Sequence, residues 1–186
     1  MFIVRIGYRP RRMMRNFYIL TFLFFGLFTS SCEETDITHD SDFEKSFSMW
    51  LTFKKNSGNS YRYTVNGASL SGDVTETEIT VEQGKVVERA FKYLMLNNPD
   101  GVSASDKEWR ETAAEVGSHH PSQAAEPLTL DQIYERARTK WLFKRENVNT
   151  YFEAKNSGLI SACGYIDKAC VTNCADGIVI RSIEKL

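Results

Sequence analysis

Apolar residues in this chain first gather in one continuous block and then recur at regular intervals. Residues 17–28 are almost entirely apolar, whereas from residue 41 onward apolar and polar positions take turns. Over residues 41–55 the apolar side chains recur mainly every three or four positions, which predicts an amphipathic helix capped by Asp40 or Ser41. A second helix is predicted after its N-cap Thr129, because one stripe contains Leu130, Ile133, Tyr134, Ala137 and Trp141.

Alternating apolar and polar positions predict strands on both sides of the second helix. Gln83-Gly84 joins two of these strands as a tight turn, and Asn156-Ser157-Gly158 joins two others. The stretch 97–127 is less regular, with a short helix expected over 105–116 because Ser105 and Glu108 have capping-box spacing. The predicted strands are residues 61–65, 75–82, 85–94, 148–154, 159–166 and 177–184.

The order of these elements predicts an α+β fold. A helix and strands come first, then the excursion, then another helix and strands. Consecutive strands joined by short turns favour antiparallel pairing, and two amphipathic helices need an apolar surface to cover. We therefore expect a single domain over residues 43–186, with an antiparallel sheet and two main helices packed on one face.

The first 31 residues have the layout of a secretory signal peptide. Five arginines and no acidic residue precede the apolar run, and Thr29-Ser30-Ser31 follows it. A helix formed by residues 17–28 would rise only about 18 Å, against a hydrocarbon layer of about 30 Å. Residues 1–31 are therefore predicted to be removed on export; the alternative is an uncleaved anchor.

The residues at the end of this leader carry a resemblance of their own. Leu27-Phe28-Thr29-Ser30-Ser31-Cys32 resembles the lipobox of bacterial lipoproteins, with Thr29 where the family usually has Leu. The resemblance implies that Cys32 becomes the lipidated N-terminus, which would anchor the protein in the outer membrane of a Gram-negative bacterium.

An acidic stretch follows Cys32 directly, with Glu33, Glu34 and Asp36 in its first half. Residues 32–42 are predicted to be a solvated tether, because charged segments of low hydrophobicity do not form a core. Glu33 to Asp36 also resembles the surface-export signal of lipoproteins in the Bacteroides group. The domain is thus expected to face either the periplasm or the cell surface.

Net charge narrows the choice of partners. Without residues 1–31 the chain has 18 basic and 24 acidic residues, a net charge of −6. Nucleic-acid affinity depends on cations that neutralise phosphates, so nucleic acid is not an expected partner. The expected partners are the membrane, through the anchor on Cys32, and a protein or glycan that the sequence does not identify.

Three cysteines near the C-terminus are expected to lie in an oxidising compartment, because the leader predicts export. Cys163 and Cys174 flank the neck of a predicted strand connection, so a Cys163–Cys174 disulfide is the leading pairing. Cys163–Cys170 is the alternative pairing. The spacing of the three cysteines does not match a zinc site, and no neighbouring residue marks any of them as a catalytic thiol.

Other polar residues that can support chemistry are interpreted as turn residues. His119-His120 stands beside Pro121 in polar sequence, where adjacent histidines serve as metal ligands less often than as solvated turns. Asp167, Asn173, Asp176 and Glu184 can supply oxygen ligands for calcium but lack the spacing of a calcium loop. No cofactor is predicted.

Several short motifs, taken in order, resemble one family of bacterial envelope proteins. They are Tyr61-Arg62-Tyr63, Ile79 to Val86, Leu128 to Tyr134, Val148 to Gly158 and Ala175 to Ile178. Together they are similar to the family known as domain of unknown function 6174, over most of residues 46–183. The resemblance implies a fold and no activity.

The function expected from these observations is that of a non-catalytic binding or accessory domain on an envelope lipoprotein. No G-x-S-x-G, H-E-x-x-H or phosphate-binding glycine motif occurs. The alternative is a hydrolase or metal-dependent enzyme built around residues 97–127 and the cysteine cluster. A binding domain could use an exposed sheet face with Tyr61, Tyr63 or Tyr165, although core positions suit these tyrosines better.

Overall fold

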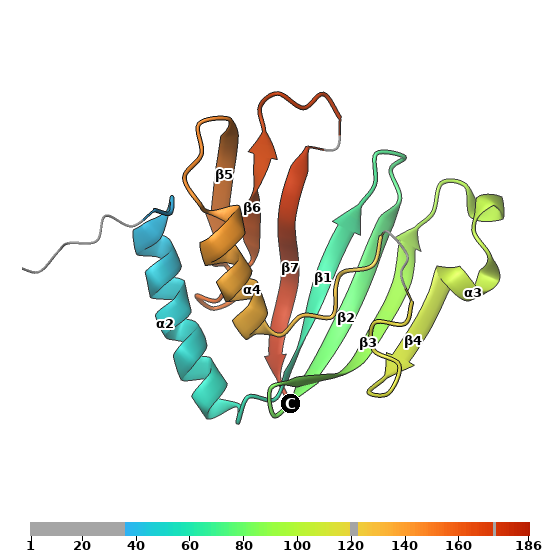
Figure 1. Cartoon of the computed structure of the whole chain (residues 1–186). Coiled ribbons are helices and arrows are strands. Elements are labelled where there is room, and N and C mark those ends of the chain that lie inside the picture. The colour runs from blue at the N-terminus through green and yellow to red at the C-terminus, as the bar shows by residue number, and fades with distance from the viewer. Residues whose placement is uncertain (1–35, 120–122, 173) are drawn as a thin grey trace, which may run out of the picture. The chain divides into compact units, whose positions relative to one another are not determined.

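A computed structural model describes residues 36–119, 123–172 and 174–186. These residues form a seven-stranded antiparallel sheet with the strand order β4-β3-β2-β1-β7-β6-β5 (Figure 1). The predicted α+β class and antiparallel sheet are confirmed. The strands are β1 (Tyr61–Ala68), β2 (Val74–Glu82), β3 (Lys85–Met95), β4 (Glu108–Thr112), β5 (Val148–Glu153), β6 (Ala162–Asp167) and β7 (Ala175–Lys185).

Two main helices cover one face of the sheet. The helix α2 (Asp40–Asn56) and the helix α4 (Leu130–Arg136) lie side by side over the half formed by β5, β6 and β7 (Figure 1). A π-helical stretch, η2 (Ala137–Trp141), continues α4. Residues 113–119 and 123–129, between β4 and α4, lie over the other half of the same face. We call this side the helix face and the opposite side the open face.

Aromatic side chains fill the space between the helices and the sheet. Trp50 of α2 packs edge-on against Tyr61, with 5.3 Å between the ring centroids, and is stacked on Tyr134 of α4. All three rings are buried. Burying such large side chains is the main apolar contribution to the stability of this layer. The remaining large core residues include Phe43, Tyr63, Ile79, Leu130, Ile133, Leu142, Ile160 and Ile180.

The start of α4 follows the prediction from sequence. Thr129 is the N-cap, and its hydroxyl and the Gln132 side chain form a reciprocal capping box. The start of α2 does not follow the prediction. His39 precedes the helix in a left-handed conformation, and neither Asp40 nor Ser41 caps it. The chain enters α2 from a bridge between Ile37 and Phe143, so a tertiary contact sets this helix end.

That bridge also shortens the predicted tether. Ile37 is buried in the core, and the amide of Thr38 donates to the carbonyl of Leu142 at 2.8 Å. Folded structure therefore begins before residue 43, and the acidic tether expected over residues 32–42 is wrong in its second half. The free energy gained by burying Ile37 outweighs the preference of the neighbouring acidic residues for a solvated, disordered chain.

The helix expected over residues 105–116 is wrong, because the segment divides into a short helix, a strand and a turn. Only α3 (Ala104–Lys107) is helical there, after a short 3-10 turn η1 (Pro99–Gly101). The following residues form β4, which pairs with β3 in the register Phe91–Trp109. Pairing with β4 gives the edge of β3 its hydrogen-bond partners and stacks Trp109 on Phe91, with 5.3 Å between the ring centroids. The capping-box spacing of Ser105 and Glu108 is a local signal and carries no information about these tertiary contacts.

No helix within the described ranges is long and apolar enough to span a membrane. The apolar run 17–28 lies outside those ranges. The signal peptide predicted for residues 1–31 therefore stays a prediction.

On the open face a tyrosine ring lies over two cross-strand glycines. Gly164 of β6 is paired with Gly177 of β7, and the hydroxyl of Tyr151 from β5 approaches both. A Cβ atom at Gly164 would overlap the carbonyl oxygen of Asp176 as well as this hydroxyl. Glycine is therefore needed here for space and not for its backbone angles.

We expect Gly164→Ala to destabilise the domain by about 2 kcal/mol, because backbone must move to admit the methyl group. The exposed Gly101 is the matched control, since its nearest neighbour is the flexible side chain of Asn98. Urea unfolding of both variants measures the difference. Equal unfolding free energies for Gly164→Ala and Gly101→Ala would contradict this account.

Candidate functional site

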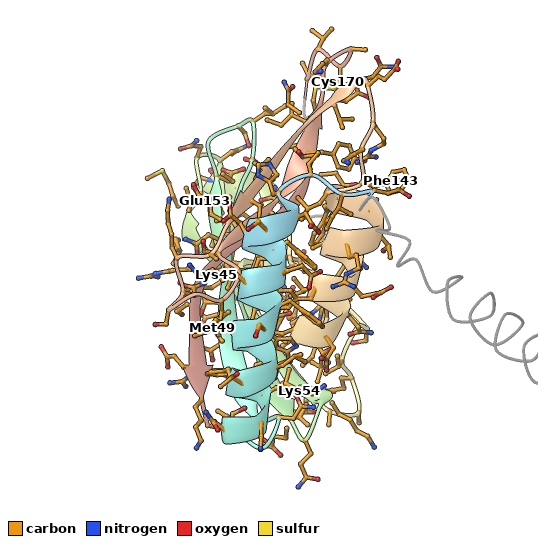
Figure 2. All side chains as sticks on the ribbon, turned by 90° about the vertical axis from the view of Figure 1, so that its left-hand side faces the viewer. Lys45, Met49, Lys54, Phe143, Glu153 and Cys170 are labelled. Carbon is orange, nitrogen blue, oxygen red and sulfur yellow. A yellow bond between two sulfur atoms is a disulfide. The ribbon has the colours of Figure 1, made fainter. Side chains whose placement is uncertain are left out.

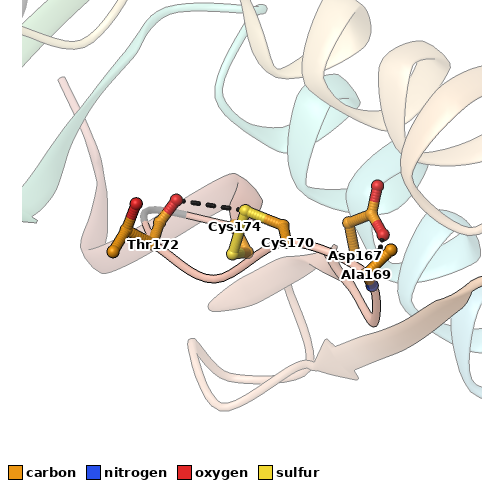
Figure 3. The surroundings of a disulfide bond; sticks show 5 residues. All are labelled: Asp167, Ala169, Cys170, Thr172 and Cys174. Atoms are coloured by element: carbon orange, nitrogen blue, oxygen red, sulfur yellow. Dashed lines mark hydrogen bonds between the residues drawn. A yellow bond between two sulfur atoms is a disulfide. The ribbon is translucent and has the colours of Figure 1, made fainter.

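The disulfide of this domain joins Cys170 to Cys174, with 5.5 Å between the Cα atoms (Figure 3). A disulfide was predicted and is found, but the pairing Cys163–Cys174 is wrong, and so is the alternative Cys163–Cys170. Strand register is the reason. Cys163 lies opposite Ile178, whereas the carbonyl of Cys174 accepts from the amide of Asp167. Four residues along a strand is about 13 Å, too far for a disulfide.

Cys163 faces the core from β6 and is fully buried as a free thiol. Burial raises the pKa of Cys163 to about 12. The thiol therefore stays protonated at neutral pH and cannot act as a ready nucleophile. Cys170 and Cys174 are held in their disulfide, so the three cysteines do not form the cluster that a zinc site or a catalytic thiol requires.

One of the predicted oxygen ligands, Asp176, is the centre of a polar cluster at the start of β7. Its carboxylate accepts from the indole of Trp141 at 2.9 Å and from the hydroxyl of Tyr165 at 3.2 Å. The ammonium of Lys140 lies 2.7 Å away. Partial burial would raise the pKa of Asp176, but these partners outweigh it and lower the pKa. Asp176 thus ties η2 to the sheet.

The other predicted calcium ligands do not join Asp176. Asp167 accepts from the amide of Ala169 at 2.8 Å (Figure 3), and Glu184 pairs with Arg62 near the opposite end of β7. Asn173 lies outside the described residues. Within those residues no three His, Cys, Asp or Glu side chains are grouped as metal ligands would be.

A buried ion pair that the sequence analysis missed lies where β3 meets β4. The guanidinium of Arg89 donates to the carboxylate of Glu111 at 3.0 and 3.2 Å, and both side chains are almost fully buried. Glu111 also accepts from the amides of Gly117 and His119, at 2.9 and 2.6 Å. The signal available in the sequence was Arg89 itself, a charged residue on the strand face that also carries Phe91.

This ion pair fastens the irregular segment onto the sheet. Besides Glu111, Arg89 donates to the carbonyls of His119 and Ala125, both from the chain that covers β3 and β4. Trp109 lies over the guanidinium at 4.8 Å and is stacked against the ring of His119. His119 therefore packs as part of a structural cluster. Its neighbour His120 lies outside the described residues.

The tyrosines considered for sheet-face binding are mostly core residues. Tyr61 and Tyr63 are buried under the helices, which confirms their assignment to the core. Tyr165 is partly buried, and the guanidinium of Arg145 lies 4.0 Å from the centre of its ring. Neither Tyr61 nor Tyr63 is available to a partner.

The open face has one half rich in ion pairs and one half in which small or apolar side chains predominate. Across β1 to β4 it carries ion pairs, with Glu76 holding both Lys92 and Arg181 at 2.8 Å. Across β6 and the start of β7 it carries Ala162, Gly164, Ile166, Ala175, Gly177 and Val179. A hollow of about 280 Å³ lies on the charged half beside Ala90. The Glu76 side chain is only 14% exposed, whereas those of Lys92 and Arg181 are about half exposed, so solvent screens these pairs only in part.

No protein-family model, curated protein or solved structure matches this chain. The resemblance to domain of unknown function 6174 therefore stays a prediction. Cys32, the predicted lipidation site, lies outside the described residues.

Protonation of Glu111 should destabilise this domain at acidic pH. Burial alone would raise the pKa of Glu111, but hydrogen bonds from His119, Gly117 and Arg89 lower it from 4.5 to about 2. Because the pKa of Glu111 is lower in the folded state, its ionised carboxylate stabilises the fold in full above pH 4.5. This contribution is lost as the pH falls towards about 2. The lost stability is on the order of 3 kcal/mol.

We expect Glu111→Gln to lower the free energy of unfolding by about 3 kcal/mol at neutral pH, because Arg89 loses its buried partner. The variant should also lose most of the pH dependence between 4.5 and about 2. Urea unfolding at a series of pH values measures both effects, with exposed Glu108→Gln on the same strand as the control. A wild-type pH dependence in Glu111→Gln would refute the assignment.

Peptide mapping without reduction should find Cys170 linked to Cys174 and Cys163 as a free thiol. In the folded protein iodoacetamide should leave Cys163 unmodified, because the thiol is buried and protonated. Adding urea should expose it to alkylation. Rapid modification of Cys163 before unfolding, or a disulfide that includes it, would contradict the observed register.

Proposed function

We propose that this chain is a non-catalytic lipoprotein of the bacterial outer membrane, with the α+β domain as a binding or accessory module. The observation that carries the proposal is Thr29-Ser30-Ser31-Cys32 directly after an apolar run too short to span a bilayer. On this view residues 1–31 are removed and Cys32 carries the diacylglyceryl group. The similarity to domain of unknown function 6174 supports the same assignment.

The described domain supports a non-catalytic role through the state of its reactive groups. The thiol of Cys163 is buried, and the carboxylates of Asp176 and Glu111 are each engaged by several donors. Catalytic acids and nucleophiles need access to a substrate, whereas these groups hold one segment of the chain to another. The state of these three groups does not favour the alternative of a hydrolase or metal-dependent enzyme.

The proposed partner and the orientation of the domain can each be tested. The partner on the outside of the domain is a protein or a glycan. The acidic stretch Glu33 to Asp36 directs the domain to the cell surface if it acts as an export signal, and otherwise the domain faces the periplasm.

Cys32→Ala is expected to release the protein from membranes, because acylation needs the thiol of Cys32. The measurements are fractionation after a carbonate wash and metabolic labelling with radioactive palmitate. Cys163→Ala is the control, since a buried thiol should neither take up label nor affect fractionation. If Cys32→Ala stays with the carbonate-washed membranes, residues 17–28 are a permanent anchor and the proposal is wrong.

A further inference from the structure

The end of the domain where the chain arrives from Cys32 collects exposed apolar side chains. At this end β1, β3 and β6 finish, β2, β5 and β7 begin, and α2 starts; we call it the tether end (Figure 1). In Figure 2 the labelled Phe143 and Cys170 lie towards the tether end, with Lys54 towards the other. We propose that the tether end rests on the surface of the phospholipid bilayer.

This inference rests on the proposed lipid anchor, and the length of the chain beyond the fold is its first argument. Asp36 already contributes to the fold, because its carbonyl accepts from the amide of Lys144 at 2.8 Å. Only four peptide units separate Asp36 from Cys32. A fully extended chain of that length spans at most about 14 Å. With Cys32 acylated, the tether end stays close to the headgroups.

The second argument is where the exposed apolar side chains lie. Among the described residues, the large apolar side chains that are exposed at the tether end are Leu70, Leu94, Met95, Phe143, Ile166 and Val171. Elsewhere they are Met49, Leu51, Val179 and Leu186. The two most exposed of all, Val171 at 94% and Leu70 at 79%, are both at the tether end. Gathering apolar surface at one end is a feature of interaction sites.

The loops that present these side chains are held in place. Val171 lies inside the ring closed by the Cys170–Cys174 disulfide. Leu70 lies in a turn organised by Asp73, whose carboxylate accepts from Ser71 at 2.6 Å and from the amide of Asn97 at 2.9 Å. Phe143 is fixed by its bridge to Ile37. A fixed loop that points an apolar side chain outward is suited to contact with an apolar surface.

Charge does not drive this contact. The basic groups at the tether end include Lys107, Lys144, Arg145 and Lys168, and the acidic groups include Asp36, Asp40, Asp73, Asp100, Asp106, Glu146 and Asp167. The acidic groups outnumber the basic ones, so attraction to anionic lipids is not the main force. The bilayer contact is instead apolar, with side chains that reach the boundary between headgroups and acyl chains.

Photo-crosslinking of the full-length protein in its own membranes tests the contact. p-Benzoylphenylalanine is placed singly at Leu70, Phe143 or Val171, and at the exposed control positions Leu51, Val179 and Leu186. Mass spectrometry then measures acylation of Cys32 and adducts with membrane lipid, which is phospholipid on the periplasmic side and lipopolysaccharide at the cell surface. We expect about tenfold more lipid adduct at the three tether-end positions, since burying one aliphatic side chain changes an equilibrium by roughly that factor.

A variant with Leu70→Asp and Val171→Asp tests the apolar contribution directly. Both side chains are highly exposed, so the fold should be kept, and the adduct at Phe143 should fall about tenfold. The matched control is Leu51→Asp with Leu186→Asp, which should leave that adduct unchanged. Unfolding free energy, measured for both double variants, checks that the fold is preserved.

The outcomes separate this contact from the lipid anchor. If Cys32 is acylated but adducts are uniform over all six positions, or are formed with protein at the tether end, the bilayer contact is wrong and the lipoprotein assignment stands. If Cys32 is not acylated, both are wrong. Unchanged adducts at Phe143 in the Leu70→Asp, Val171→Asp variant would also overturn the contact.

Discussion

Three buried tyrosine hydroxyls join the helices to the sheet, and the rest of the domain depends on them. Tyr61 accepts from the amide of Leu130 at 2.8 Å, and Tyr63 donates to the carbonyl of Leu128 at 2.5 Å. Tyr134 accepts from the amide of Ile160 at 3.1 Å. The first turn of a helix has amides without partners, and buried ones need a polar atom within the core. Tyr61 supplies it for Leu130 at the start of α4, whereas the other two hydroxyls serve a carbonyl just before α4 and an amide between β5 and β6. The three rings fill the same layer.

The position of α4 decides what the neighbouring elements can do. With α4 fixed by the tyrosines, η2 brings Trp141 and Lys140 to Asp176 and directs Phe143 to the bridge with Ile37. At the far side of the sheet, which neither α2 nor α4 covers, the Arg89–Glu111 pair fastens the covering segment instead. Apolar burial thus organises one half of the helix face, and a satisfied buried ion pair organises the other.

The two faces and the two ends of the sheet have different chemistry. The helix face is closed by packing, the open face carries ion pairs over β1 to β4, and the tether end exposes apolar side chains on fixed loops. Under the proposed lipid anchor, one end of the domain lies near lipid and the other surfaces are free for a partner. The distribution of charge and apolar surface agrees with that arrangement.

The sequence by itself determined the α+β class, the hairpin at Gln83-Gly84 and the capped start of α4 at Thr129, because these follow from local periodicity and turn chemistry. Tertiary structure decided the strand β4, the partner of Cys174 and the burial of Arg89 with Glu111. Each of these depends on which residues face each other across strands. A shift of register by one residue reverses every facing side chain, and local patterns do not carry that information.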